Sequence, residues 1–322
     1  MNVLVTGGTG FIGAYVVREL LQAGHAVVAY DIQIAQNSLD DVLEEPERSR
    51  AILVEGDVTN SAALALAIQK YEIEVIAHLA SPLSLQTEED SGFAIQNMIG
   101  AHRIVLEASR SANLRKVVWA SSVGVYGPPD RYETLPLPND APHYPTSLYG
   151  ACKSFNEYLS AYYTEKYGLD TLGLRFPLVY GIGRMRGPGM RFVDLIEKPA
   201  LGLPCRVPLA DAVYDWLYVV DAARLVVQSL SAGRTKTRNF NVSGEFASMR
   251  KAIAIVQQWL PDAVFDLEPG EYPIAEEYDA STLKSEVGFT PRWSLEQGLH
   301  ECLNIALKGA GRPLLAELPA MR

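Results

Sequence analysis

A short apolar strand at the start of the chain leads directly into a glycine-rich turn and then into an amphipathic helix. Residues 3–6 form the expected strand, residues 7–13 read GGTGFIG, and residues 11–23 have the helical pattern. Such glycines can simply supply positive φ angles. Between a strand and a helix, however, they leave backbone N–H groups and a helix N-terminus bare, which suits a pyrophosphate. The predicted dinucleotide site comprises Gly7, Gly10, Phe11, Ile12 and Gly13.

Strands and helices alternate over the first 180 residues. This pattern is typical of a parallel sheet covered on both faces, so we expect an α/β fold with a Rossmann-like, doubly wound parallel sheet. The expected strands are Val3–Thr6, Ala26–Asp31, Ala51–Glu55, Val75–Leu79, Lys116–Ser121 and Thr171–Phe176. The expected helices are Phe11–Ala23, Ser61–Tyr71, Phe93–Ser111 and Leu148–Tyr167.

Two stretches interrupt this alternation. Residues 127–147 contain six prolines and should form a loop near the carboxyl edge of the sheet, and residues 181–189 are rich in Gly and Arg. Shorter elements follow. We therefore expect a cofactor-binding domain in residues 1–180, and a smaller C-terminal α/β substrate-binding lobe in residues 181–213 and 243–322. Residues 214–242 are expected to return to the first domain.

The carboxylate of Asp31 bears on the choice of cofactor. It closes the second predicted strand, about 20 residues after the glycine turn, where a carboxylate binds the adenosine ribose and repels a 2′-phosphate. No Arg or Lys follows in residues 32–34. The sequence therefore favours NAD over NADP.

Other strand ends should reach the same crevice. Asp57 and Val58 follow the third strand, although Asp57 could equally cap a turn. His78 is more often a packed strand residue than a ligand. The fourth strand ends at three further candidate cofactor contacts, Leu79, Ala80 and Ser81.

Tyr149 and Lys153 lie four residues apart on a predicted helix and therefore share one of its faces. A free tyrosine has a pKa of about 10. A nearby ammonium and an oxidised nicotinamide ring would lower that pKa, so that the tyrosine could take a proton from a hydroxyl group. The pair arises by chance in a chain with 16 tyrosines, but here it follows a strand that ends in Ser121 and Ser122. A hydroxyl there could bind the reacting oxygen.

Composition excludes several classes of protein. Of the 322 residues, 48% are hydrophobic and 20% are charged, which is too apolar for a disordered chain. A net charge of −10 without a basic run argues against a nucleic-acid partner. Three scattered cysteines, no signal-peptide layout at the start and no long apolar run suggest a cytoplasmic protein without a membrane segment. Histidine and cysteine spacing predicts no metal site.

Several motifs occur in a fixed order and together resemble one family. They are TGGTGFIG (residues 6–13), GDV (56–58), HLAS (78–81), SSVGVYG (121–127), YGACK (149–153) and RFPLVYG (175–181). Residues 214–221, YDWLYVVD, are similar to a later segment of the same family. The chain thus resembles an extended short-chain dehydrogenase/reductase of the NAD-dependent epimerase/dehydratase family over about residues 1–225.

The resemblance implies a Ser/Tyr/Lys catalytic triad. It selects Ser122 rather than Ser121, assigns general acid/base catalysis to Tyr149, and gives Lys153 the tasks of lowering the tyrosine's pKa and holding the nicotinamide ribose. Phe176, from the RFPLVYG motif, joins the candidate cofactor contacts. Asn97 matches an asparagine that the family often has near the active site, but a solvated helix residue is an equally good interpretation.

The substrate side of the chain departs from the family. Members that act on nucleotide sugars often have Asn where this chain has Leu178, and leucine offers no hydrogen bonds to a diphosphate. Arg184, Arg186 and Arg191 could bind a phosphate or carboxylate, or could be solvated surface residues. The candidate substrate contacts are Ser81, Ser122, Tyr149, Arg184 and Arg191.

Three functions remain open. The first is an NAD-dependent oxidoreductase that oxidises a secondary alcohol of a sugar, sugar acid or related polyol. The second is a sugar or nucleotide-sugar epimerase that returns the hydride to the other face. The third is an inert NAD-binding regulatory protein, which the intact Ser122, Tyr149 and Lys153 set disfavours. The helix 148–167 is apolar on more than one side, so we also expect a homodimer through it and residues 93–111.

Overall fold

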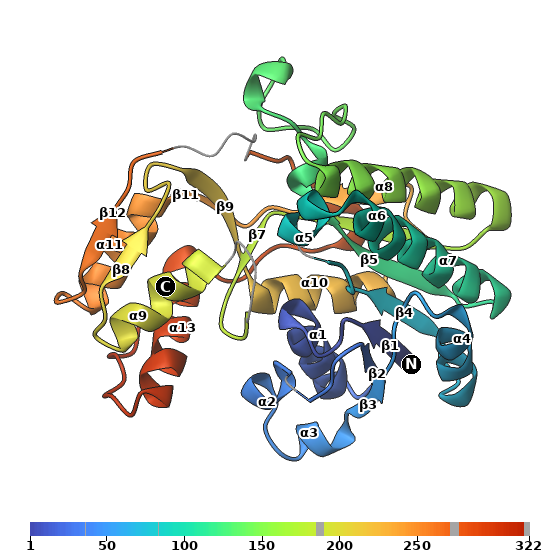
Figure 1. Cartoon of the computed structure of the whole chain (residues 1–322), viewed down its shortest axis with the longest axis horizontal. Helices are drawn as coiled ribbons and strands as arrows, with labels where there is room; N and C mark the ends of the chain where they lie inside the picture. The colour runs from blue at the N-terminus through green and yellow to red at the C-terminus, as the bar shows by residue number, and fades with distance from the viewer. Residues whose placement is uncertain (36, 83, 185–189, 271–276, 319–322) are drawn as a thin grey trace.

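Seven parallel strands form the main sheet in the part of the chain that the computed structural model describes, residues 1–35, 37–82, 84–184, 190–270 and 277–318. The strand order is β10-β6-β5-β4-β1-β2-β3. The strands are β1 (Asn2–Thr6), β2 (Ala26–Asp31), β3 (Ile52–Glu55), β4 (Val75–His78), β5 (Lys116–Ser122), β6 (Thr171–Phe176) and β10 (Asn239–Asn241). The expected α/β fold with a Rossmann-like, doubly wound parallel sheet is confirmed (Figure 1).

Helices cover both faces of this sheet because side chains along each strand alternate between them. On β1, Val3 and Val5 belong to one hydrophobic cluster, whereas Leu4, between them, belongs to another. The first cluster includes side chains of α1 (Phe11–Gln22) and α10 (Val219–Ser231). The second includes side chains of α4 (Ser61–Lys70), α7 (Ala101–Ser111) and α8 (Leu148–Tyr167).

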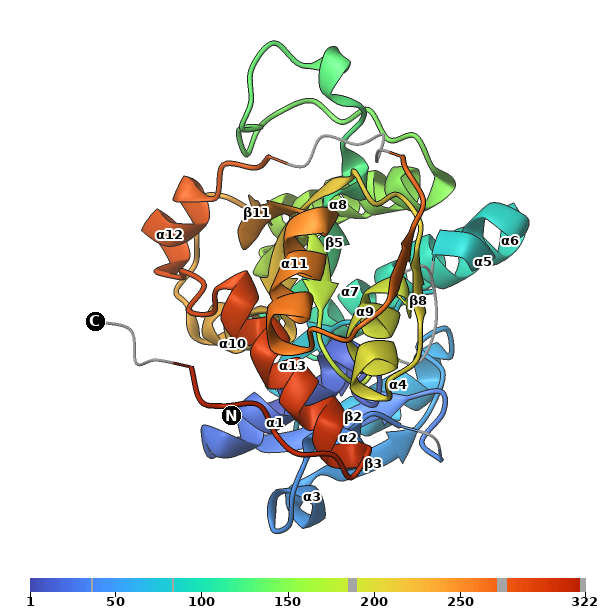
Figure 2. The same ribbon diagram turned by 90° about the vertical axis from the view of Figure 1, so that its left-hand side faces the viewer.

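A second lobe lies beside the sheet (Figures 1 and 2). A three-stranded sheet, β11-β9-β7, and a two-stranded sheet, β12-β8, form its strands in the described residues. The strands are β7 (Leu178–Tyr180), β8 (Cys205–Val207), β9 (Val213–Tyr218), β11 (Glu245–Ser248) and β12 (Phe265–Leu267). The helices of this region are α9 (Met190–Ala200), α11 (Met249–Trp259), α12 (Ser281–Val287) and α13 (Leu295–Gly309). Within residues 214–242, β9 pairs in the small sheet, whereas α10 packs on α1 and β10 pairs with β6.

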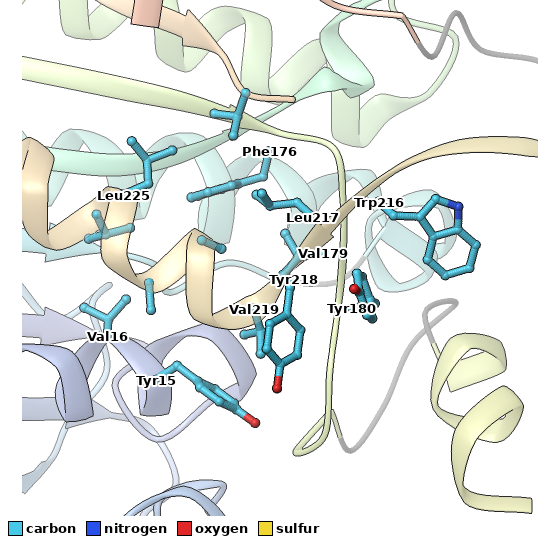
Figure 3. Packing of buried hydrophobic residues seen from close by; sticks show 14 of the residues in the cluster. Tyr15, Val16, Phe176, Val179, Tyr180, Trp216, Leu217, Tyr218, Val219 and Leu225 are labelled. Carbon is cyan, nitrogen blue, oxygen red and sulfur yellow. The ribbon is translucent and has the colours of Figure 1, made fainter. Parts of the chain in front are cut away.

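One continuous core joins the two lobes (Figure 3). Tyr15 and Val16 of α1 and Val219 of α10 share this cluster with Tyr180 of β7 and Trp216 of β9. The Tyr180 and Trp216 rings meet edge to face with centroids 5.6 Å apart. The large sheet and the small sheet therefore rest on the same packed side chains, which hold the two lobes together.

The helix expected over residues 93–111 has a different structure. It consists of α6 (Ser91–Ala94), a π-helix (Ile95–Gly100) and α7. Asn156 Nδ2 on α8 donates to the backbone oxygen of Met98 at 3.1 Å, so this carbonyl is bound from outside the helix. A hydrophobic period does not reveal such a local change from i→i−4 to i→i−5 hydrogen bonds.

Several short helices were not predicted from the sequence. They are too brief to show a period, and two of them fill the connection between β2 and β3. They are α2 (Leu39–Val42), α3 (Glu47–Arg50), α5 (Ser84–Glu89) and two 3₁₀ turns, Val123–Val125 and Pro129–Arg131. By contrast, α8 has the bounds expected from the sequence. The side chain of its N-cap, Ser147, accepts from Gly150 N, and Gly168 in the left-handed conformation ends it.

A buried polar network ties the proline-rich loop to the sheet. Arg175 on β6 forms a bidentate ion pair with Glu157 on α8, with nitrogen–oxygen distances of 2.9 and 2.7 Å. The same guanidinium donates to the hydroxyl of Tyr126 at 2.6 Å and to the backbone oxygen of Asn139 at 2.7 Å. Asn241 Nδ2 on β10 donates to the loop carbonyl of Leu137 at 3.0 Å. The loop is therefore anchored at several points from strands of the large sheet.

We predict that Arg175→Met lowers the free energy of unfolding by about 3–5 kcal/mol, because it leaves the Glu157 carboxylate buried without its partner. Arg206→Met is the matched control, since the Arg206–Glu268 ion pair is largely exposed and its loss should change the same quantity by less than about 1 kcal/mol. Urea unfolding of the two variants measures both values. Equal losses would contradict a structural role for the buried pair.

Candidate active site

A cavity of about 520 Å³ opens at the carboxyl ends of the parallel strands. Its walls come from the ends of β1, β2, β4, β5 and β6 and from the N-terminal ends of α1 and α8. All the sequence-predicted cofactor contacts line it: Gly7, Gly10, Phe11, Ile12, Gly13, Asp31, Asp57, Val58, Leu79, Ala80, Ser81, Tyr149, Lys153 and Phe176. Folding therefore brings together residues that are up to 169 positions apart in the sequence. In doubly wound sheets, ligands bind at this edge, where the strand order reverses.

The glycine turn at the base of this cavity has no room for side chains. Gly7 has a φ of +71°, and a Cβ atom there would lie 2.7 Å from the backbone nitrogen of Ala80. A Cβ at Gly13 would lie 1.9 Å from the backbone oxygen of Gly7. Gly10, the N-cap of α1, makes no side-chain cap, and the first turn of α1 carries no acidic residue. The N-terminal N–H groups of α1 thus remain available to an anionic ligand.

Asp31 is held beside this turn. The backbone N–H of Thr9 donates to Asp31 Oδ2 at 3.2 Å, which fixes the carboxylate at the rim of the cavity. Ile32 follows it with 62% of its surface exposed and also lines the cavity. Asp57 lines the cavity and also caps a turn, since its Oδ1 accepts from Thr59 N at 2.7 Å.

Ser122, Tyr149 and Lys153 meet at the other end of the cavity. The side chains of Tyr149 and Ser122 lie together beside Gly124, where the serine hydroxyl favours the phenolate form of the tyrosine. Lys153 Nζ lies 5.4 Å from the centre of the Tyr149 ring and donates to the backbone oxygen of Ala120 at 2.7 Å. Ser121 makes a different contact, since its hydroxyl donates to Glu157 Oε1 at 2.6 Å. The structure therefore places Ser122, rather than Ser121, against the tyrosine.

Burial favours the neutral forms of both Tyr149 and Lys153. It raises the pKa of Tyr149, and the hydrogen bond with Ser122 and the charge of Arg184 offset only part of that effect. Burial also lowers the pKa of Lys153 to about 8. The expected lowering of the tyrosine's pKa is therefore not produced by the chain alone, because desolvation outweighs the neighbouring charges.

The arginines expected at the substrate side differ in position. Arg184 lines the cavity, with its Cζ 4.7 Å above the Phe11 ring and its NH2 donating to Val179 O at 3.2 Å. Among the described residues no carboxylate lies within ion-pair distance of it. Arg191, on α9, instead faces the rings of Phe192 and Tyr214 and does not line the cavity. Its expected substrate contact thus finds no support, and Arg186 lies outside the described residues.

Several lining residues were missed by sequence reasoning or left undecided. Pro82, Gln86 of α5 and Phe93 of α6 follow β4 with no recognisable spacing in the sequence. Asn97, which had two interpretations, also lines the cavity, and its Nδ2 donates to Phe93 O at 3.0 Å. Leu178 packs against the shared core instead of lining the cavity. In the part of the chain described, no group of three or more acidic, histidine or cysteine side chains could hold a metal ion, and no helix is long and apolar enough to cross a membrane.

Comparisons with known proteins show the family and the fold of the chain. The model of a family described as "NAD dependent epimerase/dehydratase family" matches residues 3–243. A UDP-glucose 4-epimerase of Corynebacterium glutamicum is 28% identical over 313 residues, which cover 90% of this chain and 91% of the relative. The crystal structure of a UDP-glucose 4-epimerase from Thermotoga maritima has a TM-score of 0.83 at 23% identity and covers 97% of this chain and 99% of that one. A holo L-threonine dehydrogenase from Cupriavidus necator has a TM-score of 0.83 at 21% identity, with 94% and 99% covered.

Proposed function

The chain belongs to the NAD-dependent epimerase/dehydratase family, and from that premise we propose that it is an enzyme that oxidises a secondary alcohol of a sugar, sugar acid or related polyol with NAD. The observation that carries this proposal is the contact of Ser122, Tyr149 and Lys153 at one end of a cavity whose other end is a bare glycine turn. A binding protein without catalysis would have no need for that set of side chains.

The residues of the cavity fit NAD. The Cβ-free approach of Gly7 and Gly13 and the uncapped N-terminus of α1 leave space and donors for the pyrophosphate. We assign Asp31 to the adenosine ribose, Asp57 and Val58 to the adenine, and Lys153 to the nicotinamide ribose. Leu79, Ala80, Ser81 and Phe176 line the cavity between these ends and would contact the rest of the cofactor.

Tyr149 and Ser122 act on the substrate hydroxyl. The Ser122 hydroxyl binds the reacting oxygen and orients it, and Tyr149 Oη takes its proton. When bound, NAD would supply the acceptor for the hydride that leaves the carbon bearing this hydroxyl, and a positively charged ring beside Tyr149. Lys153 stabilises the phenolate, and its pKa of about 8 keeps most of the side chain protonated at neutral pH. The product is a ketone and NADH.

An epimerase is the second candidate, because relatives that cover most of the chain include UDP-glucose 4-epimerases. Such an enzyme would use the same first step and then return the hydride to the other face. Leu178 argues against a nucleotide sugar, since its apolar side chain packs in the core and offers no hydrogen bond to a diphosphate. The two candidates differ in the fate of the reduced cofactor. Absorbance at 340 nm should rise steadily when the substrate and free NAD are added to a dehydrogenase, and should stay constant with an epimerase.

Arg184 supports an anionic substrate. A guanidinium that lines the cavity without a carboxylate partner among the described residues can form a bidentate contact with a carboxylate or phosphate. Its position above Phe11 also allows it to bind the cofactor's pyrophosphate. We propose the substrate as its partner.

Arg184→Gln separates these two partners. If Arg184 binds the substrate, KM should rise about 10–100-fold, in line with the loss of a charge-assisted hydrogen bond of about 1.5–3 kcal/mol, while the Kd for NAD changes little. Calorimetric titration with NAD and steady-state kinetics measure both values. A large loss of NAD affinity with an unchanged KM would assign the arginine to the cofactor instead.

Tyr149→Phe tests the chemistry. The variant keeps the ring and should bind NAD as the natural enzyme does, but turnover should fall about 10²–10⁴-fold because the proton acceptor is gone. Turnover of the natural enzyme should rise with pH as Tyr149 loses its proton, and this rise should be absent from the variant.

Lys153→Ala should lose both turnover and NAD affinity. Tyr167→Phe, at the far end of α8, is the control and should match the natural enzyme. Retention of most turnover by Tyr149→Phe would remove the proposed mechanism.

Asp31→Ala tests the cofactor assignment. Loss of its charge-assisted hydrogen bond should weaken NAD binding by about 1.5–3 kcal/mol. The difference in affinity between NAD and NADP should also become smaller, because the carboxylate no longer repels a 2′-phosphate. Glu55→Ala is a matched control, since Glu55 lies beside Asp31 at the end of β3 and does not line the cavity. Binding of NADP by the natural enzyme as tightly as NAD would refute the role of Asp31.

We also propose a homodimer through α8 and residues 93–111. Three aromatic side chains form a stripe on α8 with large exposed fractions, 47% for Phe155, 71% for Tyr158 and 39% for Tyr162. A second copy of the chain would bury them. Light scattering at micromolar concentration should give twice the mass of the chain, and Tyr158→Glu should give the monomer mass. A monomer in the natural protein would exclude this interface.

A further inference from the structure

The chain segment that follows β7, residues 181–184, runs along the wall of the large cavity beside the glycine turn. Gly183 and Arg184 line the cavity together with Phe11, the first residue of α1. A Cβ atom at Gly183 would lie 4.0 Å from Phe11 Cδ2, and Arg184 Cζ lies 4.7 Å above the same ring. The segment therefore lies against the end of α1 where the pyrophosphate of NAD is expected to bind.

Two hydroxyl groups fasten this segment to the elements beside it. Tyr15 Oη on α1 donates to the backbone oxygen of Ile182 at 3.1 Å, and Figure 3 shows the Tyr15 side chain directed toward the turn that follows Tyr180. Ser38 Oγ, in the connection between β2 and β3, donates to the backbone oxygen of Gly183 at 2.7 Å. Each bond joins one side chain to one carbonyl, so it can open without the unfolding of a strand or a helix.

Ser38 provides a fixed point for this fastening. Its side chain is fully buried, and its backbone N–H donates to the backbone oxygen of Thr9, in the glycine turn, at 2.9 Å. Ser38 is also the N-cap of α2, where a serine usually binds the first turn of its own helix, but it makes no such bond. Asn37 Oδ1 accepts from Leu39 N at 3.0 Å instead. The Ser38 hydroxyl is thus used for Gly183, and both residues line the cavity.

We propose that the Ser38–Gly183 hydrogen bond is a latch that closes the large cavity over the bound cofactor, so that NAD and NADH enter and leave when this bond is open. The proposal rests on the function proposed above, because that function places the pyrophosphate at the N-terminus of α1. With the bond formed, residues 182–184, α1 and the connection after β2 enclose this end of the cavity. With the bond broken, residues 183 and 184 can move away from Phe11.

The latch has different consequences for the two candidate reactions. A dehydrogenase releases NADH in every turnover, so a closed latch slows its cycle. An epimerase regenerates its NAD on the enzyme and needs no release. The same hydrogen bond would therefore limit the turnover of the first enzyme and retain the cofactor of the second.

Ser38→Ala removes the latch hydroxyl. The association and dissociation rates of NADH, followed by stopped-flow fluorescence on the full-length protein, should both rise about 3–10-fold, which corresponds to one ordinary hydrogen bond. Because the latch opens for entry as well as for exit, the Kd for NADH should change less than about twofold. Loss of a direct contact with the cofactor would instead raise the dissociation rate and the Kd together and leave the association rate unchanged. That result would overturn the proposal.

Ser49→Ala is the matched control. Ser49 lies in the same connection, and its hydroxyl also donates to a backbone oxygen, that of Pro46, at 2.8 Å, but it does not line the cavity. Both rates should remain those of the natural protein. Tyr15→Phe removes the second fastening and should change both rates in the same direction as Ser38→Ala. Rates in Ser38→Ala equal to those in Ser49→Ala would contradict the latch.

A reversible cross-link provides a test that does not depend on the loss of a hydrogen bond. A Cβ atom at position 183 would lie 3.6 Å from Ser38 Cβ, and the two Cβ atoms of a disulfide are about 3.5–4.5 Å apart. The double variant Ser38→Cys/Gly183→Cys should therefore hold the latch closed when oxidised and free it when reduced. Gly183 has a φ of +97°, so its replacement strains the backbone. The reduced form of the same variant controls for that strain.

NADH exchange in the two redox forms gives the result. In oxidised protein that is already loaded with NADH, the cofactor should remain bound through gel filtration and should dissociate after addition of dithiothreitol. Empty oxidised protein should lose the rapid uptake of NADH that the reduced form shows. Equal exchange in both forms, with the disulfide confirmed by mass spectrometry, would refute the latch.

Failure of the proposed function gives a different pattern of results. In that case Tyr149→Phe would retain its turnover, or Asp31→Ala would retain its affinity for NAD. The latch experiments use the rates of NADH binding and release in variants that keep Tyr149 and Asp31. Their outcome is therefore separate from the tests of the reaction and of the cofactor assignment.

Discussion

The buried ion pair between Glu157 and Arg175 fixes helix α8 to the sheet, and the geometry of the site depends on it. Tyr149, Lys153 and Glu157 follow one another at intervals of four residues and so occupy one face of α8. Glu157 is bound by Arg175 on β6 and by Ser121 on β5, and Lys153 donates to the carbonyl next to that serine. The helix therefore cannot slide or rotate relative to β5 without breaking these contacts. A buried ion pair adds little net stability, but it selects one arrangement among those that the apolar contacts would allow.

The same ion pair links α8 to the proline-rich loop of residues 127–147. Arg175 also binds Tyr126 and Asn139, so the proline-rich loop, β6 and α8 are joined at one guanidinium. On the opposite side of the sheet, the shared core of α1, α10, β7 and β9 joins the second lobe to the first (Figure 3). The large cavity thus lies among elements that are each held to the large sheet. The glycine turn at one end of it and Ser122, Tyr149 and Lys153 at the other end lie near the ends of neighbouring strands.

Much of this arrangement could be predicted from the sequence because it depends on local patterns. The glycine turn, Asp31 at a strand end, and the spacing of Tyr149 and Lys153 are each readable within a few residues, and parallel strands bring their carboxyl ends together. The π-helix could not be predicted, because the hydrophobic pattern of residues 93–111 does not distinguish π-helical from α-helical hydrogen bonding. The direction of Arg191 depends on how α9 packs against Tyr214. A second, small cavity is lined by His78, His102, Trp119, Lys153 and Asn156, and most of these residues share no spacing in the sequence.

Burial acts in opposite directions on the pKa values of Tyr149 and Lys153, the two candidate catalytic groups. It raises the pKa of Tyr149 and lowers that of Lys153, so that each group by itself is driven toward its neutral form. A phenolate becomes favourable only when positive charge accumulates beside it, and a protonated Lys153 supplies one part of that charge. Under the proposed mechanism the oxidised nicotinamide ring supplies the other part. The tyrosine is then a strong proton acceptor only when the cofactor that will take the hydride is already in place.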